Sequence, residues 1–140
     1  MIHTIILLSI LTVSVFGQVG PVVGGLTNQN PSDYNDAAWK SVSQINSQSN
    51  DVDYLVPIKV LSAQTQIVAG TNTQLEVLFG ESTCQRNGQT QLSQVNAANC
   101  PIKVGGGRAI YKVSILSQPW LNVENITVQK IRDVGMNENF

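Results

Sequence analysis

Histidine is almost missing from this sequence of 140 residues, in which His3 is the only one. His3 lies in an apolar N-terminal segment that we expect to be removed, which would leave the mature chain with none. Nucleophile pairs of the Ser–His and Cys–His types need an imidazole base, and zinc sites often use imidazole ligands. The acidic residues are few, and Asp33 and Asp36 fall where a helix would begin, which suits its dipole. We therefore expect neither an enzyme nor a metal site, and no cofactor.

The apolar N-terminal segment is about as long as the core of a signal peptide and short for a membrane span. The small residue Gly17 suits cleavage at its end. We therefore expect residues 1–17 to be a signal peptide and residues 18–140 to form one secreted, extracellular domain. A membrane anchor is the alternative interpretation of this segment.

Charge is also scarce, because 12% of the residues are charged and the formal net charge is −1. This balance gives no electrostatic reason to expect nucleic acid or an anionic membrane as a partner. The glycine run at residues 105–107 lacks the surrounding pattern of a phosphate-binding loop, so we expect a flexible turn there.

Cysteine occurs twice, at Cys84 and Cys100. In a secreted chain an even pair is typical of a disulfide, which would stabilise the fold by about 3 kcal/mol in the chain-entropy model. A metal site at these two thiols is the weaker alternative, because the mature chain offers no histidine to complete it.

One segment, residues 31–51, has the apolar spacing of an amphipathic helix. Ser32 or Asp33 can cap its start. The predicted apolar stripe consists of Tyr34, Ala38, Val42 and Ile45, and Gln44, Ser47 and Gln48 should face water.

Four later segments have the composition of strands, namely residues 53–65, 72–80, 108–117 and 121–131. One helix and several antiparallel strands predict an α+β domain with the helix on one face of a sheet. Residues 20–33 should form an extended, mobile leader, and residues 132–140 should be an untethered tail that frays.

Apolar residues also lie where turns are usually polar. The sequence places them in the leader at residues 22–24, at the first hairpin at 66–70, and at the second hairpin at 119–120. Antiparallel strands can bring two hairpins to the same end of a sheet, and a leader can join them. Apolar residues that cluster in this way indicate a binding surface.

These stretches resemble the cystatins, which inhibit papain-like cysteine peptidases. The sequence QIVAG at Gln66–Gly70 matches the family pattern QxVxG at every fixed position, Gly24 matches the glycine of the N-terminal segment, and the Pro-Trp pair at 119–120 matches the second hairpin. The cysteines, in TC and NCP, resemble the first disulfide of the secreted type 2 branch. Nematode cystatins are one natural comparison.

The resemblance implies a long helix cradled by a five-stranded antiparallel sheet. It also implies a wedge that enters the cleft of cathepsin L, S or B-type peptidases, blocks it reversibly and is not cut. The implied contact residues are Val22, Val23, Gly24, Gln66, Ile67, Val68, Ala69, Gly70, Pro119 and Trp120. A cystatin-fold binding or carrier module without inhibitory activity is the alternative. We expect mainly a monomer, and the long hairpin also allows a domain-swapped dimer.

A second site is implied by the triplet Ser49-Asn50-Asp51, which follows the expected helix. Some type 2 cystatins carry this triplet at this place and use it against legumain, the asparaginyl endopeptidase. In that resemblance Asn50 enters the specificity pocket as a substrate asparagine would. The alternative is a simple helix stop, since these residue types favour turns.

Two further features concern the C-terminal part of the chain. Asn125 begins an N-x-T sequon, and glycosylation there is plausible if Ile126 and Val128 point inward. The second disulfide of vertebrate relatives is missing, and Tyr111 occupies roughly the place of one partner.

Overall fold

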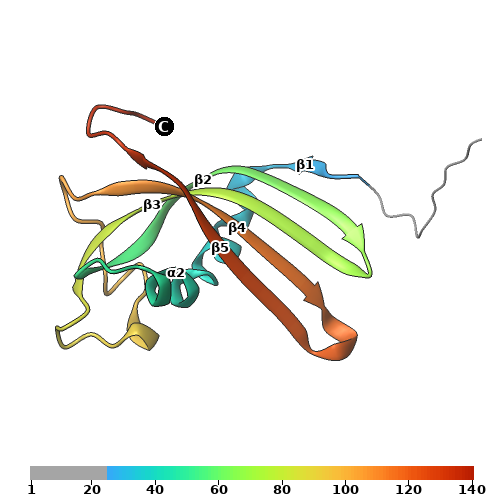
Figure 1. Cartoon of the computed structure of the whole chain (residues 1–140), viewed down its shortest axis with the longest axis horizontal. Coiled ribbons are helices and arrows are strands. Elements are labelled where there is room, and N and C mark those ends of the chain that lie inside the picture. The colour runs from blue at the N-terminus through green and yellow to red at the C-terminus, as the bar shows by residue number, and fades with distance from the viewer. Residues whose placement is uncertain (1–24) are drawn as a thin grey trace, which may run out of the picture.

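The computed structural model describes residues 25–140, and within them the strands form one five-stranded antiparallel sheet in the order β1-β2-β3-β4-β5 (Figure 1). The strands are β1 (Thr27–Gln29), β2 (Asp53–Val68), β3 (Gly70–Gln85), β4 (Arg108–Gln118) and β5 (Val123–Val134). The predicted α+β fold is confirmed. The predicted signal peptide, residues 1–17, and the leader residues 22–24 lie outside the described residues.

The helical segment is interrupted, where a single helix over residues 31–51 was expected. It consists of a 3₁₀ turn (Pro31–Tyr34), α1 (Asn35–Trp39) and α2 (Val42–Gln48). At the interruption the Ser41 hydroxyl donates a hydrogen bond of 2.7 Å to the Ala38 carbonyl oxygen. Such side-chain bonds to the preceding turn compete with the helix and bend it. The start also differs, because the Asn30 side chain accepts the Ser32 N–H and so acts as the cap.

The predicted apolar stripe of the helical segment is confirmed. Ala38, Val42 and Ile45 are buried and Tyr34 is half-buried, and the stripe packs on one face of the sheet. The segment is also hydrogen-bonded to the sheet through Asn46, which is fully buried. Its amide donates to the Val42 and Leu55 carbonyl oxygens and accepts the Leu55 N–H, at 2.8–2.9 Å. A buried amide that makes three hydrogen bonds fixes one docking geometry of α2 on β2.

The long hairpin of β2 and β3 extends beyond the predicted strand limits at both ends, because the two strands pair over nearly their whole length. The short strand β1 was not predicted from sequence. Its three polar residues pair with residues 63–65 of β2, so that the leader is extended here as expected but is also bound to the sheet.

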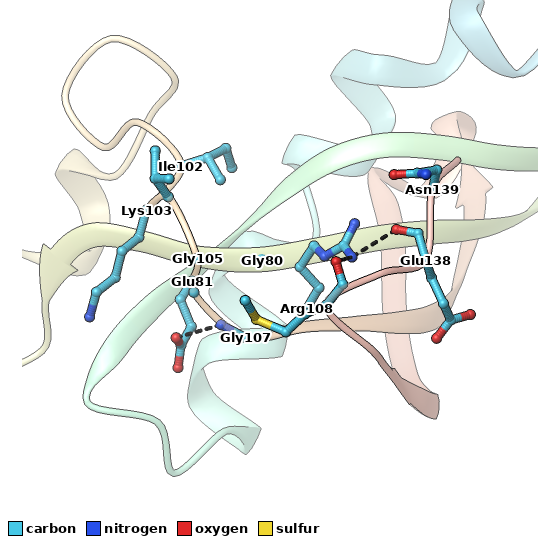
Figure 2. Close-up of a pocket in the computed structure, with 12 residues that line it drawn as sticks. Gly80, Glu81, Ile102, Lys103, Gly105, Gly107, Arg108, Glu138 and Asn139 are labelled. Atoms are coloured by element: carbon cyan, nitrogen blue, oxygen red, sulfur yellow. Dashed lines mark hydrogen bonds between the residues drawn. The ribbon is translucent and has the colours of Figure 1, made fainter.

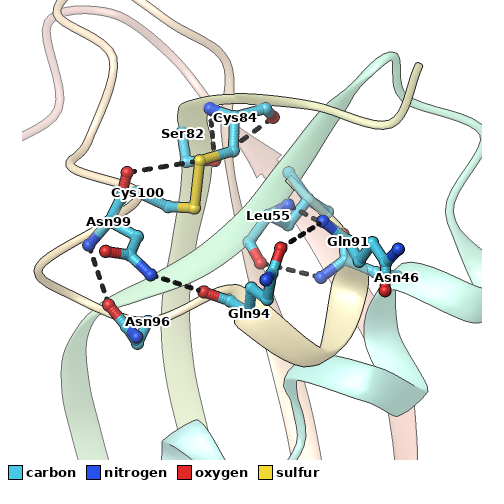
Figure 3. The surroundings of a disulfide bond; sticks show 9 residues. All are labelled: Asn46, Leu55, Ser82, Cys84, Gln91, Gln94, Asn96, Asn99 and Cys100. Atoms are coloured by element: carbon cyan, nitrogen blue, oxygen red, sulfur yellow. Dashed lines mark hydrogen bonds between the residues drawn. A yellow bond between two sulfur atoms is a disulfide. The ribbon is translucent and has the colours of Figure 1, made fainter. Parts of the chain in front are cut away.

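The predicted disulfide is present between Cys84 and Cys100, with Cα atoms 5.4 Å apart (Figure 3). It joins the end of β3 to the polar loop that follows, which is also tied to β2 by an ion pair of 2.9 Å between Lys103 and Asp53. Hydrogen bonding to Asp53 raises the pKa of Lys103. The expected turn at residues 105–107 is observed, with Gly105 at φ +75°.

The C-terminal tail does not fray as expected. Arg108 donates to the carbonyl oxygens of Gly135 and Glu138, at 2.8 and 2.9 Å, and Figure 2 shows the bond to Glu138. The Glu138 carboxylate in turn accepts the Gly135 N–H and pairs with Arg132. These bonds lower the pKa of Glu138, the Gly135 N–H being the main cause. The expectation failed because polar contacts fasten the tail in the absence of a second disulfide.

Tyr111 packs edge-on against Phe79, with ring centroids 5.5 Å apart. Partial burial of this ring raises the pKa of Tyr111. None of the helices within residues 25–140 is long and apolar enough to cross a membrane.

Candidate functional site

Two hairpins of the sheet end next to each other. The β2–β3 hairpin turns at Ala69, and the β4–β5 hairpin turns through a 3₁₀ turn, Pro119–Leu121. The pairing of Thr71 with Ser117 brings these turns to the same end of the sheet, at the right of Figure 1. We call the surface formed by residues 66–70 and 117–122 the tip edge.

Large apolar side chains on the tip edge point into water. Ile67 is 66% exposed and Trp120 is 63% exposed, and Leu121, which sequence analysis missed, is 58% exposed. Ala69 and Pro119 are also exposed. No residue of the tip edge carries a charged side chain. A clustered, uncharged and apolar surface of this kind is typical of a site for another protein.

Gly70 holds the two hairpins in close contact. Its φ is +115°, in a region that residues with a Cβ rarely adopt. A Cβ built on Gly70 would lie closer than 3.0 Å to the Ser117 carbonyl oxygen and 3.0 Å from Gln118 Cγ. The packing of one hairpin on the other therefore requires glycine at this position, independently of any partner that binds the tip edge.

Gln118 joins the two turns directly, and sequence analysis did not single it out. Its Nε2 donates a hydrogen bond of 2.8 Å to the Ala69 carbonyl oxygen. The acceptor is a main-chain atom 49 residues away, so no local pattern could have revealed the pair. Together with the contact at Gly70, this bond makes the tip edge one rigid unit.

The second turn displays Trp120 through its backbone geometry. Pro119 occupies the first position of the 3₁₀ turn, where its fixed φ is favourable. Asn122 closes the turn in the left-handed region, at φ 57°, and its N–H donates to the Pro119 carbonyl oxygen. The tight turn leaves Trp120 at the tip instead of folded onto the sheet.

The strand β1 directs the leader toward the tip edge. Thr27 pairs with Thr65 and Gln29 pairs with Ala63, so moving back along β1 leads toward the turn at Ala69. Gly25 and Leu26 directly precede β1, and both are exposed. The expected contact residues Val22, Val23 and Gly24 lie outside the described residues.

The triplet Ser49-Asn50-Asp51 forms a turn between α2 and β2, in which Asn50 and Asp51 are exposed and Ser49 is half-buried. The Ser49 hydroxyl accepts the Asp51 N–H at 3.0 Å, while none of the described residues hydrogen-bonds the Asn50 side chain. The triplet precedes the start of β2, and the first turn of the tip edge lies at the other end of this strand. The strand has 16 residues, so the two places are separated by about 50 Å of strand.

The sequon that begins at Asn125 is exposed on β5, which is an edge strand of the sheet. Asn125 and Thr127 face water, while Val128 is buried and Ile126 is half-buried. The alternation that the sequence suggested is therefore present.

A cavity of about 440 Å³ lies at the opposite end of the sheet from the tip edge, between the glycine turn and the tail (Figure 2). Its polar groups are bound to one another: Arg108 holds the tail, and the Glu81 carboxylate accepts the Gly107 N–H at 2.7 Å. Within residues 25–140 no cluster of three or more histidine, cysteine or acidic residues could hold a metal ion.

Comparison with known proteins agrees with the geometry. The family model of the cystatin domain matches residues 24–130. Cystatin cpi-1 from Caenorhabditis elegans is 57% identical over 117 residues, which cover 84% of this chain and 84% of that protein. Cystatin-C from Oryctolagus cuniculus is 31% identical over 134 residues, covering 84% of this chain and 86% of that protein.

A solved structure shows the same fold. The crystal structure of Al-CPI superposes with a TM-score of 0.64 at 34% sequence identity, covering 77% of this chain and all of that chain. Two adjacent hairpin turns on a five-stranded sheet, a family match over most of the sequence and a nematode relative at 57% identity lead to one conclusion. The chain belongs to the cystatin family, whose members inhibit papain-like cysteine peptidases.

Proposed function

We propose that this chain is a secreted, reversible, tight-binding inhibitor of papain-like cysteine peptidases of the cathepsin L, S or B type. The observation that carries the proposal is the tip edge, where exposed Ile67 and Trp120 lie on two hairpins that are joined to each other. The inhibitor blocks the substrate cleft with this edge and offers no peptide bond to the catalytic thiol.

Burial of the tip edge supplies the binding energy. Ile67 and Trp120 are each about two-thirds exposed, so covering them contributes roughly 1–2 kcal/mol apiece from apolar area alone. Trp120 adds a large, stiff contact surface of the kind that dominates interfaces. The edge is uncharged, so inhibition should depend little on ionic strength.

Rigidity of the two turns also favours tight binding. The Gln118–Ala69 hydrogen bond and the close packing at Gly70 fix the two turns before the enzyme arrives. Conformational entropy that the turns have already lost on folding is not lost again on binding, so it does not weaken the binding free energy. Val68 and Gly70 keep the turn slim, so that it can approach the catalytic groove, and Gln66 lies on the strand leading into it.

The leader forms the third part of the wedge in this proposal. Val22 and Val23 fill subsites on the non-primed side as a substrate does, and Gly24 lets the backbone bend close to the enzyme. The register of β1, which directs the chain toward the tip edge, supports this role.

We further propose that Ser49-Asn50-Asp51 inhibits legumain. Asn50 is exposed between two neighbours whose backbones are fixed, so its side chain can enter a pocket that selects asparagine. The separation of about 50 Å of strand from the tip edge allows both peptidases to bind one inhibitor molecule.

Secretion, the removal of residues 1–17, a mainly monomeric state and glycosylation at Asn125 complete the proposal. The apolar N-terminal segment and the disulfide support secretion. The exposure of Asn125 and Thr127 supports access for the glycosylation machinery.

Titration of active papain or a cathepsin L preparation with residues 18–140 tests the main function. We expect complete inhibition at one inhibitor per active enzyme, recovery of activity on dilution, and an uncut inhibitor by mass spectrometry. No inhibition at micromolar concentration would refute the proposal and favour a carrier module with the same fold.

A further inference from the structure

Arg86 binds the backbone of the exposed turn that contains Asn50. Its Nη2 donates to the Ser49 carbonyl oxygen at 3.1 Å, and its Nε donates to the Asp51 carbonyl oxygen at 3.0 Å. Its Nη1 donates to the carbonyl oxygen of Asn46, in the last turn of α2, at 2.9 Å. One guanidinium thus holds the backbone on both sides of Asn50 and joins it to the helix before it.

The backbone of Arg86 takes part in the same arrangement. Its N–H donates to the Val52 carbonyl oxygen at 2.7 Å, which fixes the chain where it enters β2. One residue therefore binds four main-chain carbonyls, two of them in the turn and one on each side of it. Asn50 itself is left with its side chain in water.

Neighbouring residues hold Arg86 in place. It follows β3 directly and lies two residues after Cys84, which the disulfide anchors to Cys100. Its guanidinium lies 5.4 Å from the centre of the buried Tyr54 ring, within the range of a cation–π contact. Among residues 25–140 no carboxylate forms an ion pair with Arg86, so its charge acts on the carbonyl dipoles of the turn.

We propose that Arg86 is the positioning residue of the legumain site: it holds the turn as a rigid display for Asn50. This inference rests on the proposed inhibition of legumain and adds the residue on which that activity depends. A turn with fixed flanks loses little conformational freedom on binding and resists the distortion that cleavage after Asn50 requires. Without the clamp, the turn becomes a flexible loop that legumain treats as a substrate.

Arginine is needed for this task because its donors form a planar fork. Nε, Nη1 and Nη2 each reach a different carbonyl oxygen, which a single ammonium on a flexible stem cannot reproduce. Arg86→Lys, which keeps the charge, therefore separates the fork geometry from a general effect of positive charge.

The test compares residues 18–140 as wild type, Arg86→Ala and Arg86→Lys. The matched control is Arg108→Ala, because Arg108 also binds main-chain carbonyl oxygens but does so on the C-terminal tail. For each protein the inhibition constants for legumain and papain are measured. Intact-mass spectrometry follows the rate of cutting after Asn50 by legumain, and thermal unfolding checks that the fold is kept.

We expect Arg86→Ala to weaken legumain inhibition by about tenfold or more and to be cut after Asn50 at least tenfold faster, while papain inhibition is unchanged. Arg86→Lys should behave like Arg86→Ala, and Arg108→Ala like the wild type. Unchanged legumain inhibition in Arg86→Ala would overturn the proposal. Full rescue by lysine, or an equal loss in Arg108→Ala, would overturn it as well.

The cutting rates separate this inference from the proposed function. If the wild type fails to inhibit legumain, the second function is refuted, yet Arg86 is still tested by cleavage of the turn. Faster cutting of Arg86→Ala than of the wild type would then still show that Arg86 fixes the turn. Equal rates, or no cutting of either protein, would overturn its positioning role.

Discussion

Replacing Gly70 by alanine tests whether the tip edge works as one rigid unit. Gly70 has φ +115°, and a non-glycine residue at positive φ costs about 1–2 kcal/mol. The added Cβ would also lie closer than 3.0 Å to the Ser117 carbonyl oxygen, a main-chain atom that cannot rotate away. Overpacking of this kind costs about 1–3 kcal/mol. The total is therefore roughly 2–5 kcal/mol.

This cost should appear mainly as lost affinity, because the hairpins meet at a sheet end where they can separate. A loss of 2–3 kcal/mol corresponds to inhibition of papain that is about 30- to 150-fold weaker. Most of the change should lie in faster dissociation, which stopped-flow or surface-based kinetics measures. Unfolding in denaturant records the part of the cost that falls on stability.

Gly105→Ala is the matched control. Gly105 also has positive φ, at +75°, but a Cβ there meets nothing within 4 Å, and it lies in the turn that follows the disulfide. The control should lose about 1 kcal/mol of stability from its backbone angle alone and inhibit papain like the wild type. If Gly70→Ala matched the wild type in both inhibition and stability, the two hairpins would not be locked together as described.

Four further predictions concern the tip edge, the Asn50 turn, the leader and the C-terminal tail. Gln118→Ala should weaken papain inhibition about 3- to 10-fold, the value of one lost hydrogen bond to Ala69, whereas an unchanged inhibition constant would show that this bond does not rigidify the edge. Asn50→Lys should abolish legumain inhibition and spare papain inhibition, and a loss of both would contradict two separate sites. Deleting residues 18–24 should speed dissociation from papain, and equal rates would show that the leader takes no part. The hydrogen bond between the Glu138 carboxylate and the Gly135 N–H should be present above the usual pKa of a glutamate and lost as the pH falls through the lowered pKa of Glu138 in the folded state. NMR of the Gly135 N–H measures this loss. A bond that persists in acid, or that Glu138→Gln leaves unaffected, would contradict the role of the Glu138 carboxylate in holding the tail.

Periodic and short-range features of this fold could be predicted from the sequence. The apolar stripe of the helical segment follows from side chains at helical spacing, and Ala38 and Ile45 are both fully buried. The disulfide between Cys84 and Cys100 was predictable from the pair alone once secretion was assumed. The unusual placement of Ile67 at a hairpin turn was the local signal for the tip edge.

Features that depend on distant main-chain atoms could not be predicted. Gln118 and Arg86 act on carbonyl oxygens, and every residue type offers the same carbonyl, so the partners leave no mark in the sequence. The short strand β1 is polar and gains its structure from pairing with β2. Ser41 interrupts the helix through a bond to the preceding turn, although the apolar spacing continues across it.

The most direct test of the central claim is amide hydrogen exchange of residues 18–140, measured free and in complex with papain. We expect binding to slow exchange at residues 66–70 and 117–122, on the two turns of the tip edge. Exchange at the turn containing Asn50 should not change, because that turn would remain available to legumain. Protection that spares both hairpin turns, or none at all in a mixture where papain is inhibited, would contradict the wedge.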